Sequence, residues 1–283
     1  MHISVMVYSF RAALERGEID LPRLIQRLRE LDVAHVELMD SLMGEQEDAV
    51  RKALAETELS VPCYDLVCDV AIHDRAERTK RLARFRQRLT QAAAFGARLV
   101  LVVPGLPGAG IDPWMTRQWF CEALQACLPD AARLGITLTI ENLGILADLY
   151  GRSEHILAIC DAVGPELKVT FDAGNFLLAG EDNVAALDRL APRVAHVHFK
   201  DWKVVPPGTA CAYPGVDGRL YQGTALGDGI ANLRGVLGRL QDLCYGGAIS
   251  VEYEGPGEPD AAVCRGLAHV RALLGGSQSK SSL

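Results

Sequence analysis

The sequence has no excess of basic residues: 29 Lys and Arg stand against 36 Asp and Glu, giving a formal net charge of −7. Nucleic acids and anionic membranes are bound by basic surfaces, so this balance argues against both as partners. No apolar run approaches the roughly 18 residues of a membrane-spanning helix, and the N-terminus lacks the basic segment and longer apolar stretch of a secretory leader. We therefore expect a cytoplasmic protein.

The sequence also lacks any Cys-x-x-Cys pair, although it contains eight cysteines. They are scattered through apolar or helical stretches, at positions 63, 68, 121, 127, 160, 211, 244 and 264. This distribution indicates neither a zinc knuckle nor a disulfide framework, and we expect reduced thiols in the core.

Short β-rich runs alternate with longer amphipathic runs along the chain, which is typical of repeated βα units around a parallel sheet. The expected strands lie near 2–8, 33–39, 61–67, 98–104, 136–142, 167–173, 194–200 and 247–253. With 283 residues, 49 % of them hydrophobic, the chain is long enough for one large domain over 1–275. Residues 276–283 are expected to form a disordered tail.

Eight βα units predict an α/β fold of the (β/α)8 TIM barrel type. A doubly wound sheet would give a similar alternation, but no Gly-x-Gly-x-x-Gly follows the first strand. The helix signals agree: Asp20 is a candidate N-cap before Leu21–Leu31, and Gly96 is placed to end the helix that precedes the fourth strand.

Four acidic or imidazole side chains come late in four of the expected strands: Glu141, Asp172, His198 and Glu252. A parallel barrel brings the carboxyl ends of its strands together in one mouth, where barrel enzymes build their sites. Three carboxylates and one imidazole form a ligand set for one divalent cation. The oxygen majority favours Mn²⁺ or Mg²⁺, and the imidazole leaves Zn²⁺ or Co²⁺ open.

The motifs around these positions are Ile-Glu-Asn (140–142), Phe-Asp-Ala-Gly-Asn (171–175), His-Val-His-Phe-Lys-Asp (196–201) and Ser-Val-Glu-Tyr-Glu (250–254). In this order they resemble the xylose-isomerase-like barrel superfamily, and its sugar phosphate isomerase/epimerase members in particular. The resemblance extends over nearly the whole chain.

The resemblance implies a metal, most simply Mn²⁺, bound by Glu141, Asp172, His198 and Glu252, with a small carbohydrate as substrate. It further implies that Glu141 and Glu252 are the catalytic pair that exchanges a proton beside a carbonyl, as in isomerisation or epimerisation. A lyase or dehydratase acting on a keto-sugar, an inosose or an oxidised glycoside remains an alternative. A homo-oligomer is possible on this basis.

Parity along the strands leaves some assignments open, because residues two apart project to the same side of a sheet. His196 shares a face with His198, and Glu254 shares one with Glu252. The family pattern selects His198 and Glu252 as ligands. Lys200 is on the same face as the histidines and could contact an enolate or a phosphate, or pair with a carboxylate.

The expected substrate-binding residues are Glu37, Asn175, Lys200 and Trp202, with Tyr64 and Asp65 as weaker candidates. Family members often have His where this chain has Asn175. An amide can bond a hydroxyl but cannot carry a proton, so a mechanism that needs this histidine loses support.

Two other classes of function are open. The superfamily includes the endonuclease IV type of DNA-repair enzyme, but the expected third and fourth strands here contain no histidine for a three-metal cluster. A catalytically silent barrel that binds a sugar or serves as a scaffold is the other class. Buried carboxylates argue against it, because they are costly without a compensating cation.

The long segment 202–229 is either a surface excursion or a cover over the substrate.

Overall fold

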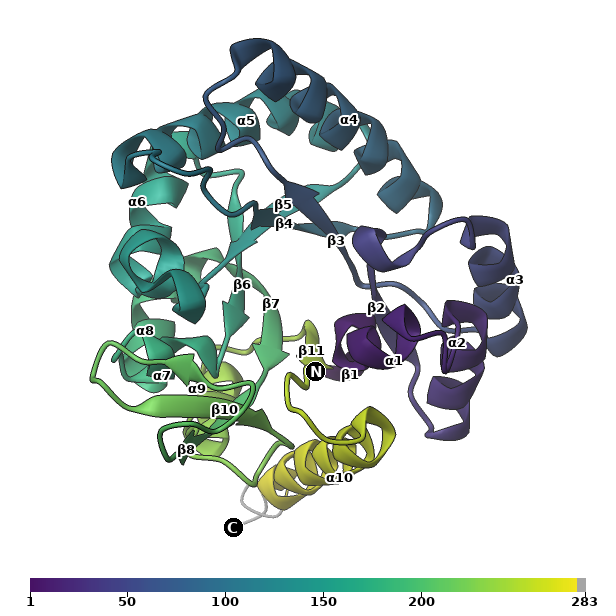
Figure 1. The fold of residues 1–283 in the computed structure, drawn as a ribbon. Coiled ribbons are helices and arrows are strands. Elements are labelled where there is room, and N and C mark those ends of the chain that lie inside the picture. Colours follow the sequence, from purple (N-terminus) through teal and green to yellow (C-terminus); the bar gives the residue numbers. More distant parts are fainter. Residues whose placement is uncertain (279–283) are drawn as a thin grey trace.

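The computed structural model describes residues 1–278. Eight parallel strands close into a barrel in the order β1-β11-β7-β6-β5-β4-β3-β2, and the helices surround it (Figure 1). The barrel strands are β1 (His2–Met6), β2 (His35–Met39), β3 (Cys63–Cys68), β4 (Leu99–Pro104), β5 (Thr137–Glu141), β6 (Lys168–Asp172), β7 (Val194–Phe199) and β11 (Ala248–Val251). The predicted TIM barrel is confirmed, and the doubly wound alternative is wrong.

Each predicted strand coincides with an observed one to within about two residues at either end. The helices are α1 (Arg11–Glu15), α2 (Leu21–Glu30), α3 (Glu47–Thr57), α4 (Arg75–Ala94), α5 (Pro113–Arg133), α6 (Ser153–Val163), α7 (Asn175–Leu178), α8 (Asn183–Leu190), α9 (Leu233–Asp242) and α10 (Pro259–Gln278). Helix α10 continues three residues into the tail expected at 276–283, and the rest of that tail lies outside the described residues.

Local sequence signals set the helix ends. The Asp20 carboxylate accepts a hydrogen bond from the Arg23 amide at 2.8 Å and caps α2. Gly96 follows α4 with a φ of 80°, a left-handed conformation that costs glycine little. Phe85, Leu89 and Ala92 on α4 are buried against the barrel. The main apolar core therefore lies between the strands and the helices.

Among the described residues no helix has both the length and the apolar composition to span a bilayer.

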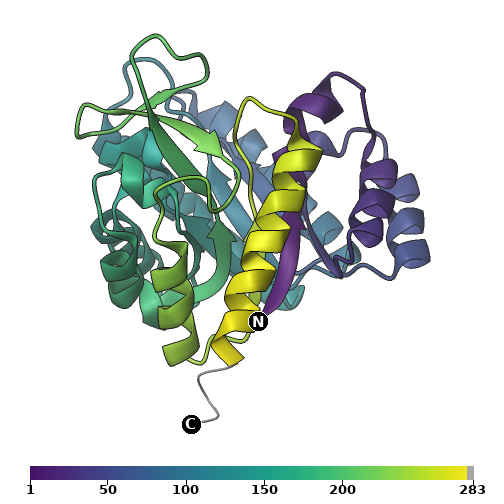
Figure 2. The same ribbon diagram turned by 90° about the horizontal axis from the view of Figure 1, so that it is seen from below.

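The segment after β7 is a small folded unit. It contains β8 (Asp201–Val205), β9 (Tyr213–Pro214) and β10 (Leu220–Thr224), which form an antiparallel sheet in the order β8-β10-β9. We call residues 201–231 the mouth sheet. Figure 2 shows it at the opposite end of the barrel from the N-terminus. The chain begins with β1, and the other barrel strands run parallel to it. The end of the barrel opposite the N-terminus is therefore where all eight strands have their carboxyl ends, and the mouth sheet lies there.

Asp201 anchors the mouth sheet to the barrel. Its buried carboxylate accepts hydrogen bonds of 2.9 to 3.0 Å from the backbone amides of Trp202, Gly227, Gly229 and Ala231. A side chain at Gly229 would meet the same carboxylate at 2.2 Å, so the loop approaches as closely as only glycine allows. One acidic side chain thus fixes both ends of this unit.

We expect Asp201→Ala to lower the free energy of unfolding by about 3 kcal/mol, because several buried amides lose a charged acceptor. Urea denaturation followed by circular dichroism measures the change. Asp188→Ala is the control, since Asp188 is an exposed residue paired with Arg239 and should change stability by less than about 1 kcal/mol. Equal effects of the two substitutions would contradict the anchoring role.

Candidate metal centre

The four residues predicted as metal ligands meet at the barrel mouth. Glu141 ends β5, Asp172 ends β6, His198 lies near the end of β7, and Glu252 directly follows β11. One potential ligand atom from each lies within 4.8 Å of the corresponding atoms of the other three, and all four residues are buried. This cluster could hold a metal ion. The strands alone bring together residues separated by more than a hundred positions.

Asp172 presents one of its two oxygens to the centre. Its Oδ1 accepts hydrogen bonds from the backbone amides of Gly174 at 2.7 Å and Asn175 at 2.6 Å. Its Oδ2 is buried and has no hydrogen-bond partner among the described residues. Burial raises the pKa of Asp172 well above its ordinary value, and the neighbouring carboxylates of Glu252 and Glu141 raise it further. A cation at Oδ2 would relieve both effects.

His198 is oriented by a carboxylate behind it. Its Nε2 lies 3.0 Å from Oε1 of Glu37, while its Nδ1 faces Glu141 Oε1 at 2.6 Å and Glu252 Oε2 at 3.3 Å. A metal-bound histidine usually donates its other ring N–H to a carboxylate, which fixes the tautomer and leaves one lone pair for the metal. Glu37 fills that role here, so the donor set fits a divalent cation.

Lys200 supplies positive charge beside the centre. Its Nζ lies 2.6 Å from Glu252 Oε1, 3.0 Å from Glu254 Oε2 and 3.7 Å from Asp172 Oδ2. Burial opposes ionisation of Glu252, but Lys200 and His198 outweigh it and lower the pKa of Glu252 to about 2. Of the alternatives for Lys200, pairing with carboxylates is what the contacts show.

The predicted substrate residues occupy different places. Glu37 is fully buried below the centre and contacts His196 and His198. Asn175 lies next to Asp172, and its side-chain amide donates to the Asn142 carbonyl at 3.0 Å. Trp202 is buried in a cluster with Leu178, Tyr213 and Tyr221, with Lys200 Nζ 5.8 Å from its ring centroid.

The weaker candidates Tyr64 and Asp65 lie on β3 and are buried. Tyr64 stacks on Phe95 behind the strand, with ring centroids 5.8 Å apart. Asp65 has its Oδ1 3.8 Å from the thiol of Cys63, in the same interior region as Glu37. Parity explains the split, because neighbouring residues on a strand face opposite sides.

Sequence reasoning missed the part played by Asn142. Its amide accepts from the Asp172 amide and donates to the Asp172 carbonyl, both at 3.1 Å, and so ties β5 to β6 at the centre. Gly174 was also missed: a side chain there would meet the Lys200 carbonyl at 2.6 Å. Both residues belong to the quoted motifs, which is the signal that could have found them.

A cavity of about 310 Å³ lies between the mouth sheet and the loops after β1 and β11. Its walls include Tyr8, Arg11, Tyr213, Tyr253 and Glu254. The Tyr213 hydroxyl donates to Glu254 Oε1 at 3.0 Å, and Glu254 in turn reaches Lys200. The mouth sheet thus closes one side of this cavity, which is connected to the candidate centre through the Glu254–Lys200 pair.

Comparison with known proteins gives the family. The model of the xylose isomerase-like TIM barrel family matches residues 25–273, and the chain belongs to that family. No curated protein sequence matches the chain.

Solved structures similar to this chain share its fold. A D-tagatose 3-epimerase-like protein is 18 % identical, with all of both chains covered and a TM-score of 0.77. The IOLI protein with a binding zinc atom is 15 % identical, with 96 % of this chain and 98 % of that chain covered and a TM-score of 0.76. The probable 3-DHS dehydratase AsbF of Bacillus anthracis is 19 % identical, with 95 % and 99 % covered and a TM-score of 0.73.

We predict that Glu141→Gln, Asp172→Asn, His198→Gln and Glu252→Gln each lower metal affinity at least tenfold, because each removes a charged or imidazole donor. Isothermal titration with Mn²⁺ on chelator-treated protein measures the affinity. Glu254→Gln is the matched control, since Glu254 also contacts Lys200 but does not belong to the four-residue cluster. A larger loss in the control than in Glu252→Gln would contradict the assignment.

Proposed function

We propose that this member of the xylose isomerase-like TIM barrel family is a divalent-metal-dependent isomerase or epimerase of a sugar or close sugar derivative. The observation that carries the proposal is the convergence of Glu141, Asp172, His198 and Glu252 within 4.8 Å at the barrel mouth. We expect Mn²⁺ there because three of the four donors are carboxylates. Mg²⁺, Co²⁺ and Zn²⁺ are the alternatives for the same ligand set.

A bound cation would polarise a carbonyl and a neighbouring hydroxyl oxygen, which acidifies the carbon-bound proton between them. Glu141 and Glu252 are the catalytic pair in this proposal. They extend from β5 and β11 toward His198 from two sides, with contacts of 2.6 and 3.3 Å to its Nδ1. One carboxylate takes the proton from carbon, and the other returns a proton to the opposite face or to the adjacent carbon.

Lys200 is positioned to act on the substrate's oxygens. Its ammonium group is held by Glu252 and by Glu254, and Glu254 also lines the cavity. There it would donate a hydrogen bond to an oxygen on which negative charge develops. Asn175 replaces the histidine common in the family and supplies an amide for hydrogen bonding. In our proposal Glu37 orients His198 and does not touch the substrate.

A lyase or dehydratase is the second candidate, and the position of Lys200 favours it. After a carboxylate removes the carbon-bound proton, the Lys200 ammonium could protonate a departing β-hydroxyl, which leaves as water. The resemblance in fold to a probable dehydratase is consistent with this chemistry. A non-catalytic sugar-binding or scaffold barrel would need no proton-exchanging pair, and we place it last.

Incubation in D₂O with a panel of ketoses, sugar phosphates, an inosose and oxidised glycosides tests the reaction. We expect solvent deuterium at one carbon of the accepted substrate, and loss of at least about a thousandfold in turnover for Glu141→Gln and Glu252→Gln. NMR measures both the exchange and the product. A new stereocentre or shifted carbonyl indicates isomerisation or epimerisation, and a product lacking a hydroxyl indicates the lyase. Unimpaired turnover by both Gln variants would exclude this pair.

The mouth sheet is expected to act as a substrate cover, because Tyr213 connects it to Glu254 at the cavity. Tyr213→Phe should raise KM or lower kcat about tenfold while metal affinity stays unchanged. Tyr221→Phe is the control, since the Tyr221 hydroxyl donates to Asp217 within the same sheet at 2.7 Å. Shortening the turn between these tyrosines should reduce activity more strongly. Unchanged kinetics in a folded deletion variant would make the segment a surface feature.

A further inference from the structure

The interior of the barrel below the candidate metal centre is polar. TIM-barrel interiors are normally filled by branched apolar side chains. Here the fully buried strand residues include Ser4, Glu37, Cys63, Asp65, Thr139, Thr170, His196 and Ser250. Placing ionisable groups in such an enclosed region costs several kcal/mol for each charge unless a partner compensates it. The barrel interior therefore contains polar side chains, some of them able to bind a metal, where apolar side chains would be enough to fill the space.

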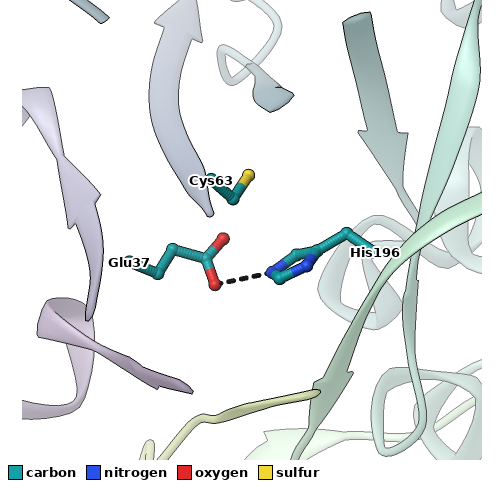
Figure 3. Close-up of side chains that lie close together, drawn as sticks. All are labelled: Glu37, Cys63 and His196. Carbon is teal, nitrogen blue, oxygen red and sulfur yellow. Dashed lines mark hydrogen bonds and ion pairs between the residues drawn. The ribbon is translucent and has the colours of Figure 1, made fainter. Parts of the chain in front are cut away.

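Three of these residues converge on one point. Glu37 comes from β2, Cys63 from β3 and His196 from β7; Figure 3 shows Glu37 and His196 facing each other, with Cys63 beside them. A carboxylate oxygen, the thiol sulfur and an imidazole nitrogen all lie within 4.8 Å of one another. His196 Nε2 lies 2.8 Å from Glu37 Oε2. No part of this trio belongs to the four ligands at the mouth.

A fourth polar group lies beside the trio. Asp65 follows Cys63 by two residues on β3, and its Oδ1 is 3.8 Å from the Cys63 sulfur. Its Oδ2 is buried and has no hydrogen-bond partner among residues 1–278. Among the described residues, Asp65 therefore adds a buried oxygen atom without a hydrogen-bond partner beside the trio.

The charges of the trio suit an enclosed divalent ion. A thiolate and a carboxylate together carry the charge that neutralises a 2+ ion, and a neutral imidazole adds none. The thiol proton leaves when the Cys63 sulfur binds, and the ring proton of His196 stays on the nitrogen that does not bind. Sulfur, nitrogen and oxygen ligands are the set that Zn²⁺ takes, whereas Mn²⁺ and Mg²⁺ prefer oxygen.

We propose that Glu37, Cys63 and His196 form a second metal site, selective for Zn²⁺ and distinct from the oxygen-rich centre at the mouth. Asp65 lies beside these three ligands, with its Oδ1 3.8 Å from the Cys63 sulfur. The site would join β2, β3 and β7 through the middle of the barrel. Because all three residues are fully buried, the ion would enter as the barrel folds and would exchange slowly afterwards.

A metal ion at the second site would also hold a ligand of the first site, His198, in a fixed orientation. Glu37 offers Oε2 toward the trio, while its Oε1 lies 3.0 Å from His198 Nε2. A carboxylate fixed by an ion at one oxygen holds the ring bonded to its other oxygen in a constant orientation. The proposal concerns a site separate from the proposed catalytic one, so either could fail without the other.

The test uses the full chain refolded with Co²⁺ and, separately, with Zn²⁺, followed by removal of free metal. We expect two metal equivalents per chain by mass spectrometry and a thiolate-to-cobalt charge-transfer band in the near ultraviolet. Cys63→Ser should lose one equivalent and the band, whereas Glu141→Gln should lose one equivalent and keep the band. Cys68→Ser is the matched control, because Cys68 is a buried thiol on the same strand outside the trio, and it should keep both.

X-ray absorption of the zinc-loaded wild-type protein tests the proposal without any substitution. One sulfur neighbour at about 2.3 Å is expected among the ligands of the bound zinc. Absence of sulfur scattering, or a wild-type protein that binds one equivalent with no thiolate band, would overturn the second site. One equivalent that retains the band in Glu141→Gln and wild type alike would leave the second site standing and would contradict the metal centre at the mouth instead.

Discussion

Lys200 and His198 neutralise a group of carboxylates at the barrel mouth that would otherwise repel one another. Glu141, Asp172 and Glu252 are all buried there, and Glu254 lies half-buried at the edge. Removing one partner of such a buried ion pair typically costs about 3–5 kcal/mol, because the remaining charge is left without compensation. The positions of the site residues therefore depend on this balance of charge as much as on packing.

The barrel geometry makes that balance possible. Register between β6 and β7 sets Asp172 opposite His198, and register between β11 and β7 sets Ser250 opposite His198, so that Glu252 falls one step nearer the mouth. The Asn142 bridge to Asp172 fixes the neighbouring strand at the same level. The pairing of the strands sets the position of each charged residue along the barrel axis. Contacts between the side chains then set the distances between the charged groups.

The mouth sheet couples the site to a cavity through a chain of polar contacts. Tyr213 bonds to Glu254, Glu254 pairs with Lys200, and Lys200 pairs with Glu252. Asp201, the residue after Lys200, anchors the same sheet through four backbone amides. Two adjacent residues, Lys200 and Asp201, therefore hold the candidate centre and the mouth sheet, so the two parts are linked through one short segment of backbone.

The sequence by itself determined the barrel, because the period of its apolar runs and the end signals at Asp20 and Gly96 act locally. It also indicated which four side chains gather at the mouth, since strand ends in a parallel barrel meet regardless of their separation along the chain. It did not show that Glu37 faces two histidines, that Cys63 joins them, or that 202–229 folds as a sheet. Only the tertiary structure decided these points, because they depend on strand order, register and closure, which bring distant residues within a few ångströms and which no local pattern encodes.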